Sequence, residues 1–467
     1  MNLAIVQPVP QPQPPGPVYR DEVALLGARL TRAGHTVRLT VTTASDANPL
    51  ADRMADTRPD LVLMAVEGLA ADAAVRAAGT CAAVLGAPVV AFGPHARRCP
   101  DACLSLAGSE AVAVAPADQV VPAYVEARGG RVDSIRTAGL WIKGETGVMR
   151  NPAPPPPESL ADEPLPARGL YRTDQTLDAA GFAPIVAARG GEAPPAAEPS
   201  APAGGPPLPG PQTGPAPWPV LHRPLDAVLQ EMHEVGHAQL DLGGWVVGNH
   251  RWASDADWLA AFAARYAREV RLPIRTTLDP ADVTPQTTGL LAQARCEEVR
   301  LPLGSASNLI RREVLGLDVT PEAVGAAVER LRDAGIRSAV DVEIGAAYET
   351  QVTLDETAAV VRRLDPDRVR VTLHWPEPGT AAERVAEEHG WLVPDPRAAW
   401  LAGRPAVVTP SLSEDVLLRT REFLPWQVLR PGIVPLLRLA WRVRIPGRGS
   451  AYDWVVTPLL GPPLRKG

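Results

Sequence analysis

The chain has 467 residues, enough for two or three domains that each bury a core of their own. Hydrophobic residues make up 46% of it and charged residues 21%, which is ordinary for a globular protein. The net charge of −7 argues against nucleic-acid binding, because that function needs a basic surface. The four cysteines form no CxxC pair, so we expect reduced thiols and a cytoplasmic protein.

The first 136 residues alternate short apolar runs with helical patterns. Expected strands cover residues 2–7, 35–42, 60–66, 87–92 and 111–115, and expected helices cover 19–33, 70–85 and 117–127. Apolar strands separated by helices indicate a parallel sheet that is covered on both faces. Ligands of such sheets bind at the carboxyl ends of the strands. We therefore predict a doubly wound, Rossmann-like domain at 1–136.

A second alternating region runs from residue 183 to 390, after a connector at 137–182. Six strands are expected at 183–188, 238–242, 274–278, 298–303, 338–344 and 368–374, with helices at 223–235, 255–269, 285–294, 320–334, 354–364 and 380–389. Six α/β repeats indicate a partial (β/α)6 barrel of the TIM type, whose functional residues concentrate at the carboxyl ends of the strands.

Residues 391–467 are expected to form a helical extension. Its apolar stretch 424–441 is interrupted by Arg430, Pro431, Pro435 and Arg438, so we expect no transmembrane segment there. An amphipathic helix lying on a membrane surface remains open for this stretch. The first residues run directly into prolines, and we expect no secretory signal.

Residues 192–219 consist mainly of Pro, Ala and Gly and offer little apolar surface to bury. Such a composition predicts a disordered or extended loop. The loop follows an apolar run and the step Arg189-Gly190-Gly191, at the beginning of the predicted barrel.

Several phrases, in order along the chain, resemble the cobalamin-binding radical SAM protein family. The resemblance extends from about residue 60 to 390 and implies a cobalamin-binding domain, a radical SAM barrel, and cobalamin and S-adenosylmethionine (SAM) as cofactors. The phrases that carry it are 58–62 (RPDLV), 92–96 (FGPHA), 139–141 (GLW), 319–322 (VTPE), 331–336 (LRDAGI), 343–350 (EIGAAYET) and 375–380 (WPEPGT).

The resemblance also implies five site residues. Gly93 and His95 match a phrase that lies beneath the corrin in relatives, although Phe92 stands where that phrase has glycine. Asp241 matches an acidic residue at the barrel mouth. Gly345 and Glu349 match a strand that packs on the adenine of SAM. The residues alone also allow plainer interpretations: a turn histidine, a turn glycine and a carboxylate favoured by a helix start.

The family's cluster loop carries CxxxCxxC, whose three thiolates bind a [4Fe–4S] cluster. Those positions correspond here to Gly191, Pro195 and Glu198, and no cysteine lies between Arg136 and Cys296. Without thiolates the protein cannot supply the cluster's chemistry. We therefore expect no [4Fe–4S] cluster and a loss of radical activity.

Three functions remain open. The first is a non-radical pseudoenzyme that binds a small ligand or a partner, such as an active homologue. The second is a cluster-independent methyltransferase that uses cobalamin or SAM. The third is zinc hydrolysis at His233-Glu234-Val235-Gly236-His237, an HExxH sequence that needs both histidines on one helical face. We expect Gly236 to end the helix and His237 to begin a strand, which disfavours zinc.

Overall fold

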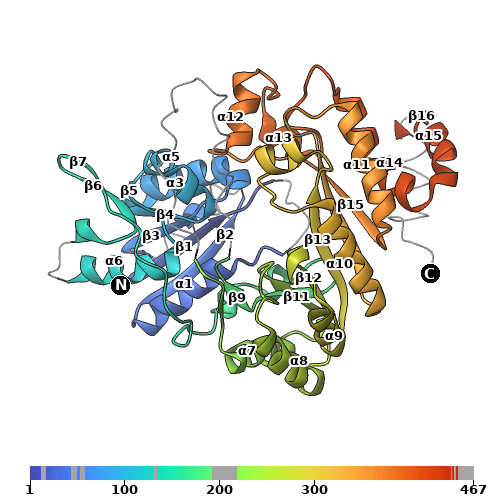
Figure 1. The fold of residues 1–467 in the computed structure, drawn as a ribbon. Helices are drawn as coiled ribbons and strands as arrows, with labels where there is room; N and C mark the ends of the chain where they lie inside the picture. Colours follow the sequence, from blue (N-terminus) through green and yellow to red (C-terminus); the bar gives the residue numbers. More distant parts are fainter. Residues whose placement is uncertain are drawn as a thin grey trace. The chain divides into compact units, whose positions relative to one another are not determined.

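The computed structural model describes residues 1–11, 17–43, 50–52, 58–130, 134–191, 218–442, 444–445 and 449–450. The chain divides into two compact units. Unit 1 comprises Met1–Pro194, Pro206–Val246 and Glu377–Gly379, and unit 2 comprises Pro195–Gly205, Val247–Pro376 and Thr380–Gly467. Figure 1 labels many of the helices and strands of both units.

Unit 1 is built on a seven-stranded sheet in the order β2-β1-β3-β4-β5-β6-β7. The first five strands in this order are parallel, and the strand order reverses at β1. This doubly wound arrangement confirms the predicted Rossmann-like fold. The strands are β1 (Asn2–Pro8), β2 (Thr36–Thr42), β3 (Leu61–Ala65), β4 (Val89–Phe92), β5 (Ser109–Ala113), β6 (Leu140–Gly144) and β7 (Gly147–Arg150).

Helices cover both faces of this sheet, because alternate strand residues point in opposite directions. Leu3 and Ile5 of β1 pack in one cluster with helices α1 (Asp21–Arg32) and α6 (Ala117–Gly129). Ala4 and Val6 pack in another cluster with helix α3 (Ala71–Leu85). Two short helices, α4 (Pro94–Arg98) and α5 (Pro100–Leu104), follow β4.

Within the described residues, one helical stretch passes a length and composition test for a membrane span, namely Gly68–Leu85. Core helices pass the same test, so this is weak evidence. Ala74, Ala77 and Ala78 of this stretch are buried in the cluster on the sheet.

Strands β6 and β7 were not predicted, since they lie in the expected connector. They form an antiparallel hairpin, and β6 pairs with β5. Leu140 and Ile142 alternate with more exposed residues, and the turn lies between Gly144 and Gly147. This alternation of buried and exposed residues, together with the two glycines of the turn, was the sequence signal that could have predicted the hairpin.

The second sheet has the order β15-β14-β13-β12-β11-β8, which confirms the predicted number of six strands, although one of them lies at other residues than expected. Its strands β12 to β15 pair in parallel. The members are β8 (Phe182–Val186), β11 (Gly244–Gly248), β12 (Ile274–Thr277), β13 (Cys296–Gly304), β14 (Arg337–Ile344) and β15 (Arg368–Leu373).

The strand expected at 238–242 is wrong. Helix α7 (Leu225–Ala238) continues through Gly236, and β11 begins only at Gly244. Gly236 is exposed, and an interior helix glycine costs only about 1 kcal/mol relative to alanine, so it need not end the helix. Trp245 and Val247 supply the buried strand residues instead.

In unit 2, one face of strands β13 to β15 is apolar and the other is charged. Val299, Leu301, Val340, Val342 and Ile344 are buried, and helices α9 (Pro285–Gln293), α10 (Pro321–Asp333) and α14 (Glu414–Leu429) pack against these strands. The opposite face, called the polar face below, carries Glu298, Arg300, Asp341, Glu343, Arg368 and Arg370. Because register partners point to the same side of a parallel sheet, these side chains lie together.

The remaining helices of unit 2 are close to prediction. They include α8 (Ala256–Glu269), α11 (Gln351–Leu364), α12 (Ala381–Glu388), α13 (Pro396–Leu401) and α15 (Val434–Arg442). The apolar stretch 424–441 is divided between α14 and α15, with the break after Leu429. Trp426, Val434 and Leu437 are buried in a cluster shared by the two helices. Contact of this stretch with a membrane surface stays a prediction.

Candidate functional site

Gly93 and His95 lie at the carboxyl end of β4, where ligands of doubly wound sheets bind. Gly93 has φ 106°, and a Cβ there would stand 2.9 Å from the backbone oxygen of Val66. The backbone N–H of His95 donates to the same oxygen at 3.1 Å. Only glycine therefore lets the chain pass β3 this closely and place His95 at the strand end.

The His95 side chain is buried, and its Nδ1 has no hydrogen-bond partner among the described residues. Such an atom is costly unless something else satisfies it. Burial lowers the pKa of His95, and the nearby Arg98 lowers it further. The imidazole is therefore neutral near pH 7, the form that binds a metal or accepts a proton.

Ion pairs occupy the rest of this sheet edge. Arg97, which stands where the family phrase has threonine, donates to Glu22 Oε1 at 2.8 Å. The same oxygen accepts from the backbone N–H of Ala117 at 2.9 Å, at the start of α6. Arg97 therefore has a structural role here. Phe92, in place of a glycine, is buried in the core beneath α1 and α6.

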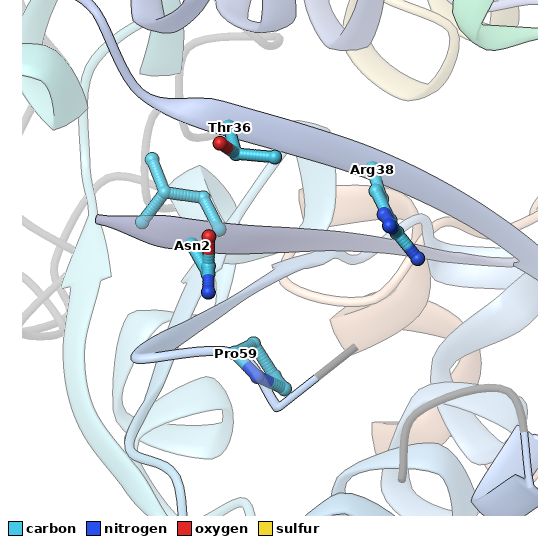
Figure 2. A pocket seen from close by; sticks show the side chains of 5 residues that line it. Asn2, Thr36, Arg38 and Pro59 are labelled. Carbon is cyan, nitrogen blue, oxygen red and sulfur yellow. The ribbon is translucent and has the colours of Figure 1, made fainter. Parts of the chain in front are cut away.

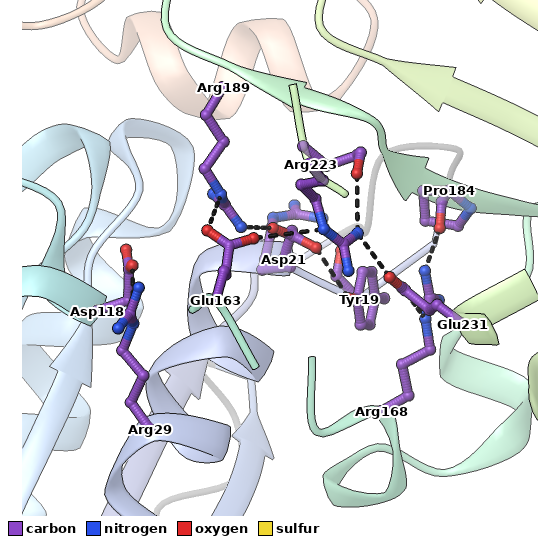
Figure 3. Close-up of polar contacts among 12 residues, drawn as sticks. Tyr19, Asp21, Arg29, Asp118, Glu163, Arg168, Pro184, Arg189, Arg223 and Glu231 are labelled. Carbon is purple, nitrogen blue, oxygen red and sulfur yellow. Dashed lines mark hydrogen bonds and ion pairs between the residues drawn. The ribbon is translucent and has the colours of Figure 1, made fainter. Parts of the chain in front are cut away.

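A buried ion network lies where the family's cluster loop begins. It comprises Tyr19, Asp21, Glu163, Arg168, Arg189, Arg223 and Glu231, all in unit 1 (Figure 3). Arg189 binds Asp21 at 2.5 Å and Glu163 at 2.8 Å. Glu163 also lies 3.4 Å from Arg223. One carboxylate thus joins the two arginines that flank the segment between residues 191 and 218.

The other half of the network centres on Glu231 of α7. Its two carboxylate oxygens accept from Arg168 and Arg223, both at 2.7 Å. The Arg168 guanidinium stacks on the ring of Tyr19, with its carbon 4.2 Å from the ring centre. Burial alone would raise the pKa of Asp21, but Arg189, Arg223 and Arg168 lower it. The network is therefore composed of charged and mutually compensated groups.

The backbone also ties the two ends of this segment together. Strand β9 (Ala188–Arg189) pairs with β10 (Leu221–His222), and the N–H of Gly191 donates to the Trp218 oxygen at 2.9 Å. A Cβ on Gly190 would stand 2.2 Å from the Pro219 oxygen, so glycine is required there.

Of the three positions that correspond to the cluster cysteines, the structure describes Gly191, whereas Pro195 and Glu198 lie outside the described residues. Gly191 has φ 68° and no side chain to offer a metal. Among the described residues, no group of three or more His, Cys, Asp or Glu side chains is placed to hold a metal ion.

In unit 2, Gly345 and Glu349 come together at the carboxyl end of β14. The N–H of Gly345, whose φ is 84°, donates to Glu349 Oε2 at 2.5 Å. Glu349 is 1% exposed, and its Oε1 has no hydrogen-bond partner in the described part of the chain. Burial raises the pKa of Glu349 to about 8, although the N–H groups of Gly345 and Ala346 work against this rise. The carboxyl group is therefore largely protonated at neutral pH.

The neighbouring strand ends in a histidine that the sequence analysis did not single out. His374 Nδ1 lies 2.5 Å from Glu343 Oε1, and its Nε2 is buried with no described partner. Ile344 pairs with Leu373, so His374 lies beside Gly345 at the same end of the sheet. A carboxylate on Nδ1 orients the ring and leaves Nε2 available to a ligand.

Asp241 lies in an exposed turn before β11 and not at a strand's carboxyl end. Asp241 belongs to unit 1, whereas Gly345 and Glu349 belong to unit 2.

The HExxH sequence lies entirely on helix α7, which corrects the expected helix end at Gly236. His233 and His237 are four residues apart and share a helical face. The helix ends one residue after His237, and that side chain is exposed. No third ligand is placed with them in the described residues. A zinc protease needs such a ligand, so the described residues do not support zinc hydrolysis.

A small cavity of about 70 Å³ is lined by Asn2, Leu3, Thr36, Arg38 and Pro59 (Figure 2). It lies at the amino ends of β1 and β2, opposite the edge that carries Gly93 and His95. Ligand pockets usually measure about 300–1,000 Å³, so this cavity is too small for either expected cofactor.

No family model matches the sequence, and no curated protein matches it. Solved structures do match. The radical SAM methyltransferase TsrM from Kitasatospora setae, solved with tryptophan and a SAM analogue, is 18% identical, with a TM-score of 0.62 over 84% of this chain and 77% of that chain. TsrM was also solved with cobalamin and a [4Fe–4S] cluster, and that structure has a TM-score of 0.61, with 18% identity over 84% of this chain and 79% of that chain.

OxsB, a cobalamin-dependent SAM radical enzyme solved with aqua-cobalamin and SAM, is 11% identical. Its TM-score is 0.65, over 98% of this chain and 70% of that chain. Identities this low show the fold and leave activity open. The chain has the fold of the cobalamin-dependent radical SAM enzymes.

Proposed function

We propose that this protein binds cobalamin at the carboxyl edge of the unit 1 sheet and works without a [4Fe–4S] cluster, as a non-radical relative of the enzymes whose fold it shares. The observation that carries the proposal is the buried, unpartnered Nδ1 of His95 at the end of β4. Such an atom is expected where a ligand supplies the missing contact.

The residues at this edge fit the cofactor. Gly93 keeps the strand end free of a side chain, and His95 offers a neutral imidazole nitrogen. These are the residues that would hold cobalamin, which supplies methyl-transfer chemistry when bound. TsrM and OxsB, solved with cobalamin, support the choice of ligand.

The residues at the cluster positions do not fit a [4Fe–4S] cluster. Gly191, Pro195 and Glu198 contain no sulfur, and no cysteine occurs from residue 104 to 295. Carboxylate and imidazole are poor ligands for a thiolate-bound cluster. The ion network that joins Arg189 to Arg223 gives this part of the fold a stabilising centre that needs no metal. A pseudoenzyme of this kind would act by binding a small ligand or a partner such as an active homologue.

Titration with hydroxocobalamin, followed by its visible spectrum, tests the proposal. We expect binding of about one cobalamin per chain, with an affinity at least tenfold weaker in His95→Ala, because groups that position or ligate a metal contribute about 10–100-fold. His237→Ala is the matched control, since His237 is an exposed histidine of the same unit. Equal affinity in wild type and His95→Ala would remove His95 from the site.

One observation favours the alternative, cluster-independent methyl transfer. The Glu343–His374 pair and Glu349 place a base and a protonated acid at the carboxyl ends of adjacent strands. The His374 imidazole, oriented by Glu343, would be able to take a proton from a methyl acceptor. Formation of S-adenosylhomocysteine together with methylcobalamin from SAM, by protein whose bound cobalamin has been reduced to cob(I)alamin, would support this function, and its absence would leave binding as the function.

A further inference from the structure

The polar face of unit 2 contains one arginine whose charge is poorly compensated. The guanidinium of Arg370 on β15 lies 3.7 Å from Asp341 Oδ1 and makes no hydrogen bond to a described residue. Its side chain is 40% exposed. Arginine carries five N–H donors, so this guanidinium has most of its hydrogen-bonding capacity unused within the described structure.

The neighbouring arginines lie closer to carboxylates. Arg300 donates twice to Asp341 Oδ2, at 2.6 and 3.2 Å. Arg368 lies 3.2 Å from Glu298, which is almost fully buried. On this part of the sheet the guanidinium groups of Arg300, Arg368 and Arg370 share the carboxylates of Asp341 and Glu298, because the third carboxylate of the polar face, that of Glu343, is bound to His374. Burial lowers the pKa of Arg370, and the positive charge of Arg300 adds to the effect. A bound anion would offset this shift by favouring the charged guanidinium.

A second polar group without a described hydrogen-bond partner, the imidazole Nε2 of His374, lies just beyond the end of the same strand. His374 is four residues after Arg370, about 13 Å along the strand, on the same side of the sheet. Its Nδ1 is held by Glu343, whereas its buried Nε2 has no described partner. The arginine side chain would span part of this separation, and a ligand the size of an amino acid or an aromatic acid would be long enough to span the rest.

We propose that the polar face of β13 to β15 binds a small carboxylic acid, with its carboxylate on Arg370 and a polar group at its far end on His374 Nε2. Guanidinium groups match carboxylates in shape and charge, and such bonds are stronger than neutral ones. The site lies in unit 2 and does not depend on cobalamin binding in unit 1.

Calorimetric titration with three probes tests the proposal on the full chain. The probes are 4-hydroxybenzoate, which has both polar ends, benzoate, which lacks the far hydroxyl, and 4-hydroxybenzamide, which lacks the charge. Wild-type protein should bind 4-hydroxybenzoate at least tenfold more tightly than the amide, because a hydrogen bond to a charged group is worth about that much. Added chloride should weaken binding of the two acids alone.

Two variants assign the ends of the ligand. Arg370→Gln should weaken 4-hydroxybenzoate about tenfold or more and leave the amide unchanged. His374→Phe should reduce 4-hydroxybenzoate to the affinity of benzoate. Arg332→Gln is the matched control, since Arg332 forms an exposed ion pair with Asp365 on another element.

The proposal is wrong if wild type binds none of the acids or binds the amide equally well, or if Arg370→Gln has no effect. The comparison among the three probes on wild-type protein decides the question even where a variant does not fold.

Discussion

Replacement of Glu231 by alanine is expected to lower the free energy of unfolding by about 3–5 kcal/mol. Glu231 is 2% exposed and accepts hydrogen bonds from Arg168 and Arg223. Its removal would leave two buried guanidinium groups without this carboxylate, and an unpaired buried charge costs far more than an exposed one. The shift in the urea unfolding midpoint of unit 1, followed by tryptophan fluorescence and circular dichroism, measures the effect.

A matched control is an ion pair of the same unit that is exposed. Asp174→Ala breaks the pair with Arg172, and both of those side chains are largely exposed. Solvent screens exposed pairs, so they contribute little to stability and the midpoint should hardly move. Equal effects of Glu231→Ala and Asp174→Ala would contradict the idea that the buried network stabilises the two ends of the segment between residues 191 and 218.

Glu349→Gln is expected to change how stability depends on pH. The pKa of Glu349 is raised from 4.5 to about 8, mainly by burial, so the folded protein keeps a proton that the unfolded chain loses above pH 4.5. The unfolded state binds fewer protons in this window, and wild-type stability therefore falls as pH rises from about 4.5 to about 8. Each pKa unit corresponds to about 1.4 kcal/mol, which gives about 5 kcal/mol at most.

The glutamine variant has no proton to lose at this position. The difference between its free energy of unfolding and that of wild type should therefore increase in favour of the variant across this pH window and stay constant above pH 8. Urea unfolding at a series of pH values checks the difference between the two proteins. Glu356→Gln, at an exposed position on α11, is the control and should follow wild type. Parallel pH curves for wild type and Glu349→Gln would show that Glu349 is not held protonated in the fold.

Much of the fold could be predicted because its patterns are local. Thr320 caps α10 by accepting a hydrogen bond from the Ala323 N–H, and Pro321 follows at the first helical position, as expected from the sequence. Gly236 misled the prediction, since an exposed glycine is tolerated inside a helix when buried neighbours such as Val235 hold that helix on the core. The β6–β7 hairpin was missed because its short strands looked like part of a connector.

The candidate site was only partly predictable. Gly93, His95, Gly345 and Glu349 could be singled out because each stands in a short phrase. The ion network could not, since Asp21, Glu163, Arg189 and Glu231 come from distant parts of the chain and meet only in the fold. For Glu343 and His374, the available sequence signal was the occurrence of polar residues at alternate positions of two adjacent strands. This pattern predicts a polar face of the sheet, but it does not predict that these two side chains contact each other.

The most direct test of the central claim is the iron and cobalt content of protein purified without oxygen and reconstituted with iron, sulfide and hydroxocobalamin. The account predicts about one cobalamin per chain, no stoichiometric iron and no visible absorbance of a cluster. Stoichiometric iron with the spectrum of a [4Fe–4S] cluster would contradict it, because ligands other than Gly191, Pro195 and Glu198 would then have to hold that cluster.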